Sequence, residues 1–451
     1  MTLSLSAIRD CFEGAIPAVI ATCAPDGTPN VTLLSQVHFV DENHVALSFQ
    51  FFSKTRENVL ANPRAMVQVI HPETGTHFYL SLEYLRTETE GPLFEYMKAK
   101  LAGVASHTGM SKVFRLRGSD VYRVLAIDCP AEPVPPSSLQ SHNRLAQLRA
   151  CSQCLTGHTD LADLLDDVLS GLQSQFYIRY AIVMMHDAEG ARLYTVASRG
   201  YPESGVGSEV ALGDGVIGVA AQQRTPIRIG YIVNDYAYSR AVRHQLTSDA
   251  AHSLETEIPF PGLAEPHSQM AVPILSADRL VGVLYVESPD EMRFKHEDED
   301  ALVILARQTA LAIQAATLSA RDIPEEQRAA RNAAVPQTGP AIPIRRFPAN
   351  DSVFIGNDYL IKGVAGAIFW KLISHYVQDG RTEFSNRELR HDPALRLPDV
   401  SDNLEARLIL LQRRLAERCP FLSIEKTGRG RFRLQVTRTI ALRDMSLDAR
   451  D

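Results

Sequence analysis

Residues 212–229 read LGDGVIGVAAQQRTPIRI, and residues 270–288 read MAVPILSADRLVGVLYVES. In the first stretch a Leu-Gly-Asp-Gly turn precedes a short helix, and a strand rich in β-branched residues follows. In the second stretch two apolar runs flank a turn, which predicts a β-hairpin. Together the two stretches predict an antiparallel sheet with a helix beside it.

More helices and strands are predicted around this centre. Residues 142–157 and 160–176 carry apolar side chains at helical spacing, and 180–200 is a further hairpin. Residues 294–316 form a long helix that begins with acidic residues. Over 142–317 this order resembles a GAF domain. The resemblance implies an antiparallel sheet with flanking helices that binds a small molecule, and the residues leave the identity of that ligand open.

Two features of this middle block allow competing interpretations. Phe294, Asp298 and Glu299 match half of the cyclic-nucleotide signature of GAF domains, but the Asn-Lys half is absent, so helix-dipole complementarity explains them better. Cys151 and Cys154 are i,i+3 neighbours on a helix, where packing is the favoured interpretation and a redox switch is the alternative. The irregular spacing of histidines predicts no metal site.

The N-terminal block, residues 1–130, is rich in strands. Residues 17–40 predict a hairpin around Ala-Pro-Asp-Gly-Thr-Pro, and SKTRENVLANP at 53–63 predicts a short capped helix. Many strands with short helices suggest a small β-barrel. The block resembles the flavin-binding split barrels of the pyridoxamine-phosphate-oxidase-like superfamily.

That resemblance implies a cofactor site. It assigns the flavin phosphate of FMN to the start of the short helix, where backbone N–H groups, hydroxyls and an ammonium suit a phosphate. Haem or no cofactor are the alternatives, no catalytic residue is assigned, and the resemblance implies a homodimer. The cofactor-binding candidates are Ser35, Gln36, Ser53, Lys54, Thr55 and Asn58, with Arg56 beside them.

The C-terminal block, residues 350–442, follows a Pro- and Ala-rich linker at 318–349. Helices are predicted within 354–376, 384–392 and 402–419, followed by two strands at 421–427 and 431–436, which is the winged-helix order. The block resembles the C-terminal effector domain of response-regulator transcription factors. The alternative is a protein-binding winged helix, because the third helix carries an apolar run. The predicted DNA contacts are Arg407, Arg413, Arg414, Lys426, Arg429, Arg431 and Arg433.

Charge is divided unevenly along the chain. The 451 residues carry a net charge of −7, but residues 351–442 have 15 basic and 11 acidic side chains, whereas the first 350 have 29 and 39. The basic block therefore suits double-stranded DNA although the whole chain is acidic. Six cysteines without disulfide spacing, no signal peptide and no apolar run of membrane-spanning length predict a cytoplasmic protein without membrane contact.

These patterns predict a multidomain α+β protein with a split β-barrel, a GAF antiparallel sheet with flanking helices, and a winged helix. The predicted function is a ligand-responsive one-component transcription regulator, a homodimer whose partners are double-stranded DNA and a small molecule. The alternative is an FMN-dependent oxidoreductase of the split-barrel superfamily, with a regulatory GAF domain and a protein-docking winged helix.

Overall fold

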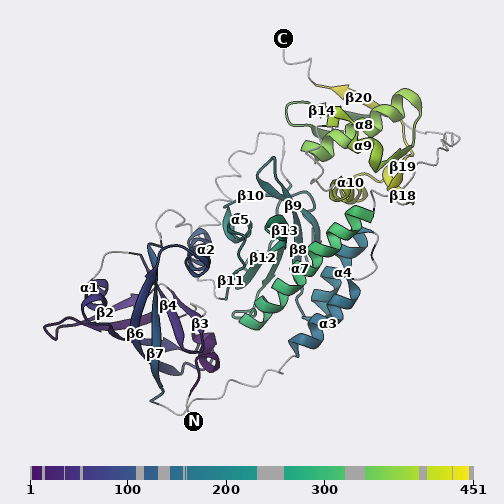
Figure 1. Ribbon diagram of the computed structural model, residues 1–451. Helices are drawn as coiled ribbons and strands as arrows, with labels where there is room; N and C mark the ends of the chain where they lie inside the picture. Colours follow the sequence, from purple (N-terminus) through teal and green to yellow (C-terminus); the bar gives the residue numbers. More distant parts are fainter. Residues whose placement is uncertain are drawn as a thin grey trace.

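The computed structural model describes residues 3–12, 16–34, 36–50, 54–107, 116–130, 143–155, 158, 160–230, 258–319, 341–395, 404–428 and 430–445. These residues form three parts that lie in a row, with the N-terminal part at one end and the C-terminal part at the other (Figure 1). Each part has its own antiparallel or mixed sheets, so the protein is a multidomain α+β structure.

The N-terminal part is a seven-stranded sheet in the order β2-β1-β5-β6-β7-β4-β3. Its elements are η1 (Ser6–Phe12), β1 (Ala18–Cys23), β2 (Pro29–Leu34), β3 (Val37–Asp41), β4 (His44–Phe49), α1 (Lys54–Ala61), β5 (Arg64–Ile70), β6 (His77–Glu88), α2 (Pro92–His107) and β7 (Gly118–Asp128). The alternating burial of β1 places Ala18 and Ile20 in the barrel core. This is the small barrel that the strand pattern predicts.

The middle part is a six-stranded sheet in the order β10-β9-β8-β13-β12-β11. Its elements are α3 (Arg144–Cys154), α4 (Leu161–Gln175), β8 (Tyr180–Asp187), β9 (Arg192–Arg199), β10 (Glu209–Ala211), α5 (Gly215–Gln223), β11 (Ile227–Ile229), β12 (Ser268–Ser276), β13 (Arg279–Ser288) and α7 (His296–Ser319). The stretch that begins at Leu212 forms a turn, α5 and β11, and 270–288 forms the β12–β13 hairpin.

Helix α7 is the longest described helix, and by length and composition His296–Leu318 could cross a membrane. In this fold Leu302, Leu305 and Ala306 are instead buried in the apolar core that α7 shares with α3, α4 and β12. Core packing therefore accounts for the apolar character of this helix.

The C-terminal part contains a four-stranded sheet, β16-β15-β14-β20, and a three-stranded sheet, β17-β19-β18. Its elements are β14 (Ile342–Phe347), β15 (Ser352–Ile355), β16 (Asp358–Ile361), α8 (Gly363–Asp379), β17 (Glu383–Ser385), α9 (Asn386–Arg390), η2 (Pro393–Leu395), α10 (Leu404–Arg418), β18 (Leu422–Gly428), β19 (Arg431–Val436) and β20 (Ile440–Asp444).

Two elements of this part differ from the sequence-based expectation. A helix lies in the 354–376 stretch as predicted, from Gly363 to Asp379, but the residues before it pair as the unpredicted strands β15 and β16. Strand β14 lies in the segment interpreted as linker, where it pairs with β15 and, in parallel, with β20. Such pairing between distant segments leaves little local signal in the sequence.

The barrel packs directly on the middle part through α2. A Cβ atom at Gly103 would lie 2.6 Å from the Cγ2 atom of Ile227, so only glycine allows α2 to approach β11 this closely. Below it, Tyr96 donates a hydrogen bond of 2.9 Å to Glu299, whose carboxylate also pairs with Arg228 at 2.8 Å. Charge and shape thus join the two parts.

His38 provides a test of this contact. The centroids of the His38 and Tyr96 rings are 4.9 Å apart. The pKa of His38 is lowered to about 3, mainly by burial. The charges of Lys100 and Arg9 also lower this pKa, and the charge of Glu299 opposes them. The unfolded chain therefore binds a proton below about pH 6.5 that the native protein binds only near pH 3. The free energy of unfolding is therefore greatest above about pH 6.5. Below this pH it decreases by up to about 1.4 kcal/mol for each unit by which the pH is lowered.

We expect His38→Gln to remove this pH dependence. Urea unfolding between about pH 7 and pH 5.5 should show a stability loss about 1 kcal/mol larger in the wild type than in the variant. His44→Gln, on the partly exposed face of β4, should respond like the wild type. Equal pH responses of the wild type and His38→Gln would contradict the assignment.

Candidate functional site

The first turn of α1 lies against the β1–β2 hairpin. Asn30 donates a 2.9 Å hydrogen bond to the Thr55 hydroxyl, and the amide of buried Asn58 donates one of 3.1 Å to Thr22. Lys54 is exposed and lies 3.8 Å from Glu57. Thr55 and Asn58 therefore anchor the helix, and Lys54 is the side chain that points to solvent at its start. The predicted Ser53 lies outside the described residues.

Arg56 ties the same turn to β7. Its guanidinium forms an ion pair with Asp120 and lies 4.4 Å from the centroid of the Phe49 ring. Thr87 donates a 2.5 Å hydrogen bond to the same carboxylate. Burial lowers the pKa of Arg56, but the hydrogen bond and the charge of Asp120 outweigh it, so the pKa is raised. This pair fixes the position of the α1 start, and the sequence reading had not singled out Asp120.

Four buried polar side-chain atoms of the barrel have no hydrogen-bond partner among the residues that the structure describes. They are Gln36 Oε1, Ser48 Oγ, Gln50 Oε1 and Ser119 Oγ. Ser48 and Ser119 face each other in register on β4 and β7, and the Ser48 amide donates to the Gln36 carbonyl oxygen at 3.1 Å. An unsatisfied buried polar group costs about 1–3 kcal/mol, so a cluster of them suits a polar ligand.

Of these four residues, the sequence analysis assigned only Gln36. The alternation of side chains along β4 could have indicated two of the others. Ser48 on β4 and Gln50 just after it fall on the same face as buried Ala46. Ser35, the neighbouring cofactor-binding candidate, lies outside the described residues. Ser119 and Asp120 are neighbours on β7, so the side chains of Ser48 and Ser119 point to the other face of the sheet from the carboxylate that pairs with Arg56.

The predicted DNA contacts lie on two elements, α10 and the β18–β19 hairpin. Arg407 and Arg414 of α10 are only 6% and 3% exposed. The Arg407 guanidinium lies 4.0 Å from the Tyr194 ring centroid and 3.3 Å from an Asp187 oxygen. Arg414 donates to the Leu360 carbonyl at 3.2 Å. Helix α10 therefore presents both arginines to the protein interior in this structure.

The other predicted contacts differ in their surroundings. Arg413 pairs with Asp166 at 2.8 Å and Lys426 pairs with Asp160, both across the boundary to the middle part. Arg433 pairs with Glu383 at 2.7 Å within the C-terminal part, and Arg431 is exposed. Arg429 lies outside the described residues.

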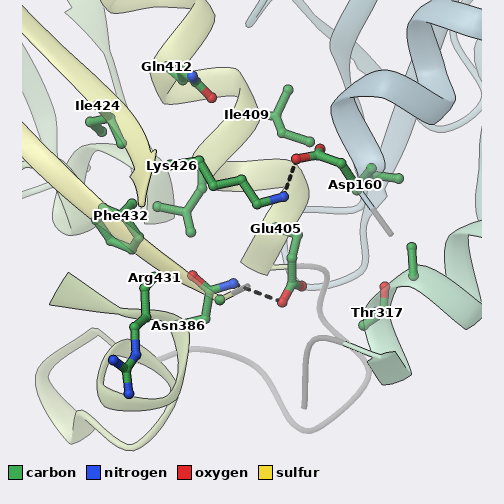
Figure 2. A pocket seen from close by; sticks show the side chains of 14 residues that line it. Asp160, Thr317, Asn386, Glu405, Ile409, Gln412, Ile424, Lys426, Arg431 and Phe432 are labelled. Carbon is green, nitrogen blue, oxygen red and sulfur yellow. Dashed lines mark hydrogen bonds and ion pairs between the residues drawn. The ribbon is translucent and has the colours of Figure 1, made fainter. Parts of the chain in front are cut away.

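A cavity lies at this boundary (Figure 2). Its wall on the middle part comes from the start of α4 and the end of α7, and its other wall comes from α9, α10 and the β18–β19 hairpin. The Lys426–Asp160 pair crosses it, and Asn386 donates a 3.2 Å hydrogen bond to Glu405 on its floor. The apolar lining includes Ile409, Ile424 and Phe432. The two parts thus meet without filling the space between them.

The acidic residues at the start of α7 have structural partners. Asp298 is fully buried, pairs with Arg144 at 2.8 Å and accepts a 3.0 Å hydrogen bond from the Lys295 amide. Phe294 is fully buried, and Glu299 pairs with Arg228. These contacts agree with the interpretation of the half signature as a structural feature of the helix start.

The Cys-x-x-Cys pair shows two different environments. Cys151 is buried against Gly171, and burial raises the pKa of its thiol to about 11, whereas Cys154 is exposed. A protonated buried thiol reacts poorly, which favours packing as the role of Cys151. Among the residues that the structure describes, no group of three or more His, Cys, Asp or Glu side chains is arranged to hold a metal ion.

Comparison with known protein families supports the domain assignments of the N-terminal and middle parts. The GAF domain family matches residues 160–313, and the family described as pyridoxamine 5'-phosphate oxidase matches residues 5–124. The chain therefore carries a split-barrel domain like that of pyridoxamine phosphate oxidase and a GAF domain, as the sequence motifs predict. The two matched ranges end at residue 313, before the C-terminal part, and no curated protein matches the chain.

Solved structures resemble single parts of the chain. The GAF domain of an Acinetobacter phosphoenolpyruvate-protein phosphotransferase is 24% identical, covering 40% of this chain and 97% of that one, with a TM-score of 0.31. An FMN-binding protein from Syntrophomonas wolfei subsp. wolfei is 16% identical, covering 28% and 90%, with a TM-score of 0.24. Free methionine-R-sulfoxide reductase from Neisseria meningitidis is 18% identical, covering 42% and 99%, with a TM-score of 0.32.

Proposed function

We propose that this protein is a ligand-responsive transcription regulator in which a flavin-binding barrel and a GAF domain control a winged-helix DNA reader. By "reader" we mean residues 341–445. The observation that carries the proposal is the clustering of basic side chains on α10 and the adjoining β18–β19 hairpin. Helices α8, α9 and α10 followed by this hairpin have the order of a winged helix, in which the third helix enters the major groove.

A second candidate function is an FMN-dependent oxidoreductase, favoured by the unsatisfied polar atoms of the barrel. Both candidates require the flavin site, but only the regulator requires DNA binding. A basic reader attached to two acidic sensory domains has no role in flavin chemistry, whereas a regulator needs it. We therefore favour the regulator.

The barrel residues fit FMN chemically. Lys54 and the first backbone N–H groups of α1 suit the phosphate dianion. Gln36 and Gln50 offer side-chain oxygens that accept hydrogen bonds from a flavin ring N–H, and the hydroxyls of Ser48 and Ser119 add donors. When bound, FMN supplies redox chemistry, and the protein groups bind and orient it.

We expect the protein to bind FMN, with quenching of flavin fluorescence on titration. Lys54→Ala should raise the Kd about tenfold, because it removes one charge-assisted hydrogen bond to phosphate. Lys98→Ala on α2 is the matched control and should bind like the wild type. Absence of FMN uptake by the wild type, or an unchanged Kd in Lys54→Ala, would contradict the cofactor assignment.

A second proposal concerns the homodimer. Val31 and Leu33 of β2 are 66% and 68% exposed, and Met66 of β5 is 46% exposed. Val31 and Met66 both pair in register with Ala21 of β1, so they lie in one apolar row across three strands. We propose that a second copy of the chain covers this face by two-fold symmetry.

Light scattering should then give twice the chain mass of 49.8 kDa. The double variant Val31→Glu/Leu33→Glu should be monomeric. Dimer formation would have to bury two carboxylates per chain without partners, which is costly. Val377→Glu, on an exposed position of α8, should stay dimeric. A monomeric wild type, or a dimeric double variant, would overturn this proposal.

Electrophoretic retention of promoter-sized duplex DNA tests the reader itself. Binding should weaken steeply with salt, because phosphate contacts release counterions. Arg431→Ala should lower the affinity for all sequences and reduce the salt slope by about one. Arg64→Ala, an exposed arginine of the barrel, is the control. If the wild type and its variants retain no DNA even at low salt, the regulator proposal fails.

A further inference from the structure

We propose that an acidic face of the GAF domain, made of Asp160, Asp166, Asp187 and Glu209, is the docking surface for the reader and competes with DNA for the reader's basic side chains. This inference rests on the proposed function and adds its regulation. The partner that fits the acidic face is thus the basic face of the reader in the same chain.

Four ion pairs join the two faces, each with its carboxylate on the GAF domain. Lys426 pairs with Asp160, and Arg413 pairs with Asp166 at 2.8 Å. The other pairs are Arg407 with Asp187 at 3.3 Å and Lys362 with Glu209 at 3.1 Å.

Further hydrogen bonds and apolar contacts accompany these ion pairs. Arg413 also donates a 3.1 Å hydrogen bond to the Val196 carbonyl of β9, and the Ser204 hydroxyl donates to Glu417 of α10. One apolar cluster continues from Leu164 of α4 to Ile409 of α10. The reader is therefore held by a specific interface with defined partners.

This interface covers the side of α10 that DNA would need. Arg407 is 6% exposed and lies over the Tyr194 ring of β9. A recognition helix must enter a groove about 12 Å wide with its basic side chains facing the DNA. Arg407, Arg413 and Lys426 cannot contact phosphates while they contact the GAF carboxylates, so docking and DNA binding exclude each other.

The chemistry and the packing both suit a separable contact. Carboxylate oxygens present to Arg and Lys the same charge as phosphate oxygens, so DNA can replace them. Burial raises the pKa of Asp160, but the hydrogen bonds from Lys426 and from the Ala162 amide outweigh it, and the carboxylate is ionised at neutral pH. The cavity at the contact (Figure 2) shows that the two faces are not packed at interior density.

The test removes three charges from the GAF domain and none from the reader. The triple variant Asp160→Asn/Asp166→Asn/Asp187→Asn keeps amide oxygens that cap α4 and accept from the Gly190 amide. Asp300→Asn, an exposed carboxylate near the opposite end of α7, is the matched control. The full chain is used throughout, with a 30-bp duplex of arbitrary sequence as probe.

We expect the triple variant to bind this duplex roughly tenfold more tightly than the wild type or the control at low salt. We also expect a steeper salt dependence in the variant, because in the wild type salt weakens docking and DNA binding together. Amide hydrogen exchange of α10 without DNA should be faster in the variant. Asp166→Asn alone repeats the test if the triple variant does not fold.

Three outcomes separate the two proposals. Tighter DNA binding and faster exchange of α10 in the variant support the docking surface. Equal DNA affinities with equal salt slopes in all three proteins overturn it and leave the regulator proposal standing. Faster exchange of α10 with no DNA retained by any protein overturns the regulator proposal while supporting the docking contact.

Discussion

The ion pair between Glu299 and Arg228 is the interaction on which the packing of the barrel against the GAF domain depends. Glu299 lies in the first turn of α7 and Arg228 on β11, and both are buried. Burial raises the pKa of Glu299, but Lys100, Arg228 and Tyr96 together lower it, so the carboxylate stays charged inside the protein. Removing one partner from such a pair costs about 3–5 kcal/mol. Because Tyr96 belongs to the barrel, this charge holds the barrel, the sheet and α7 together.

Helix α7 carries this constraint from one end of the protein toward the other. Lys295, the residue before α7, pairs with Glu73 of the barrel at 2.8 Å, and the last turn of α7 lines the cavity beside the reader. A helix of 24 residues spans about 36 Å. Under the proposed regulation, a shift of the start of α7 would move its last turn, which lines the cavity beside the docking surface. In this view the buried charge at Glu299 sets the reference position for the switch.

Local patterns in the sequence predicted those elements whose signal is local. The turn at Leu212, the hairpin over 270–288 and the helix over 402–419 follow from turn residues and from periods of two or 3.6. The same rules missed β14 and β20, because their parallel pairing joins residues about a hundred positions apart. They predicted DNA contacts at Arg407 and Arg414 but not their burial, since a helix period cannot tell which neighbour covers a basic face. The polar atoms around Gln36 come from three separate segments, and only the folded barrel brings them together.

The first 350 residues are acidic and residues 351–442 are basic, and this division allows two interpretations of the basic side chains. A basic stretch in an acidic chain indicates a nucleic-acid reader, but the acidic residues of the same chain are the nearest anions available to it. Because these acidic residues are tethered to the reader, their effective concentration is high. Under the proposed regulation they compete with dilute DNA for the basic side chains of the reader. Of the docked carboxylates, Asp160 is the N-cap of α4, Asp166 lies on α4 and Asp187 ends β8. Under the proposed function, a ligand that moved these elements by a small distance would weaken several ion pairs at once and so release the reader.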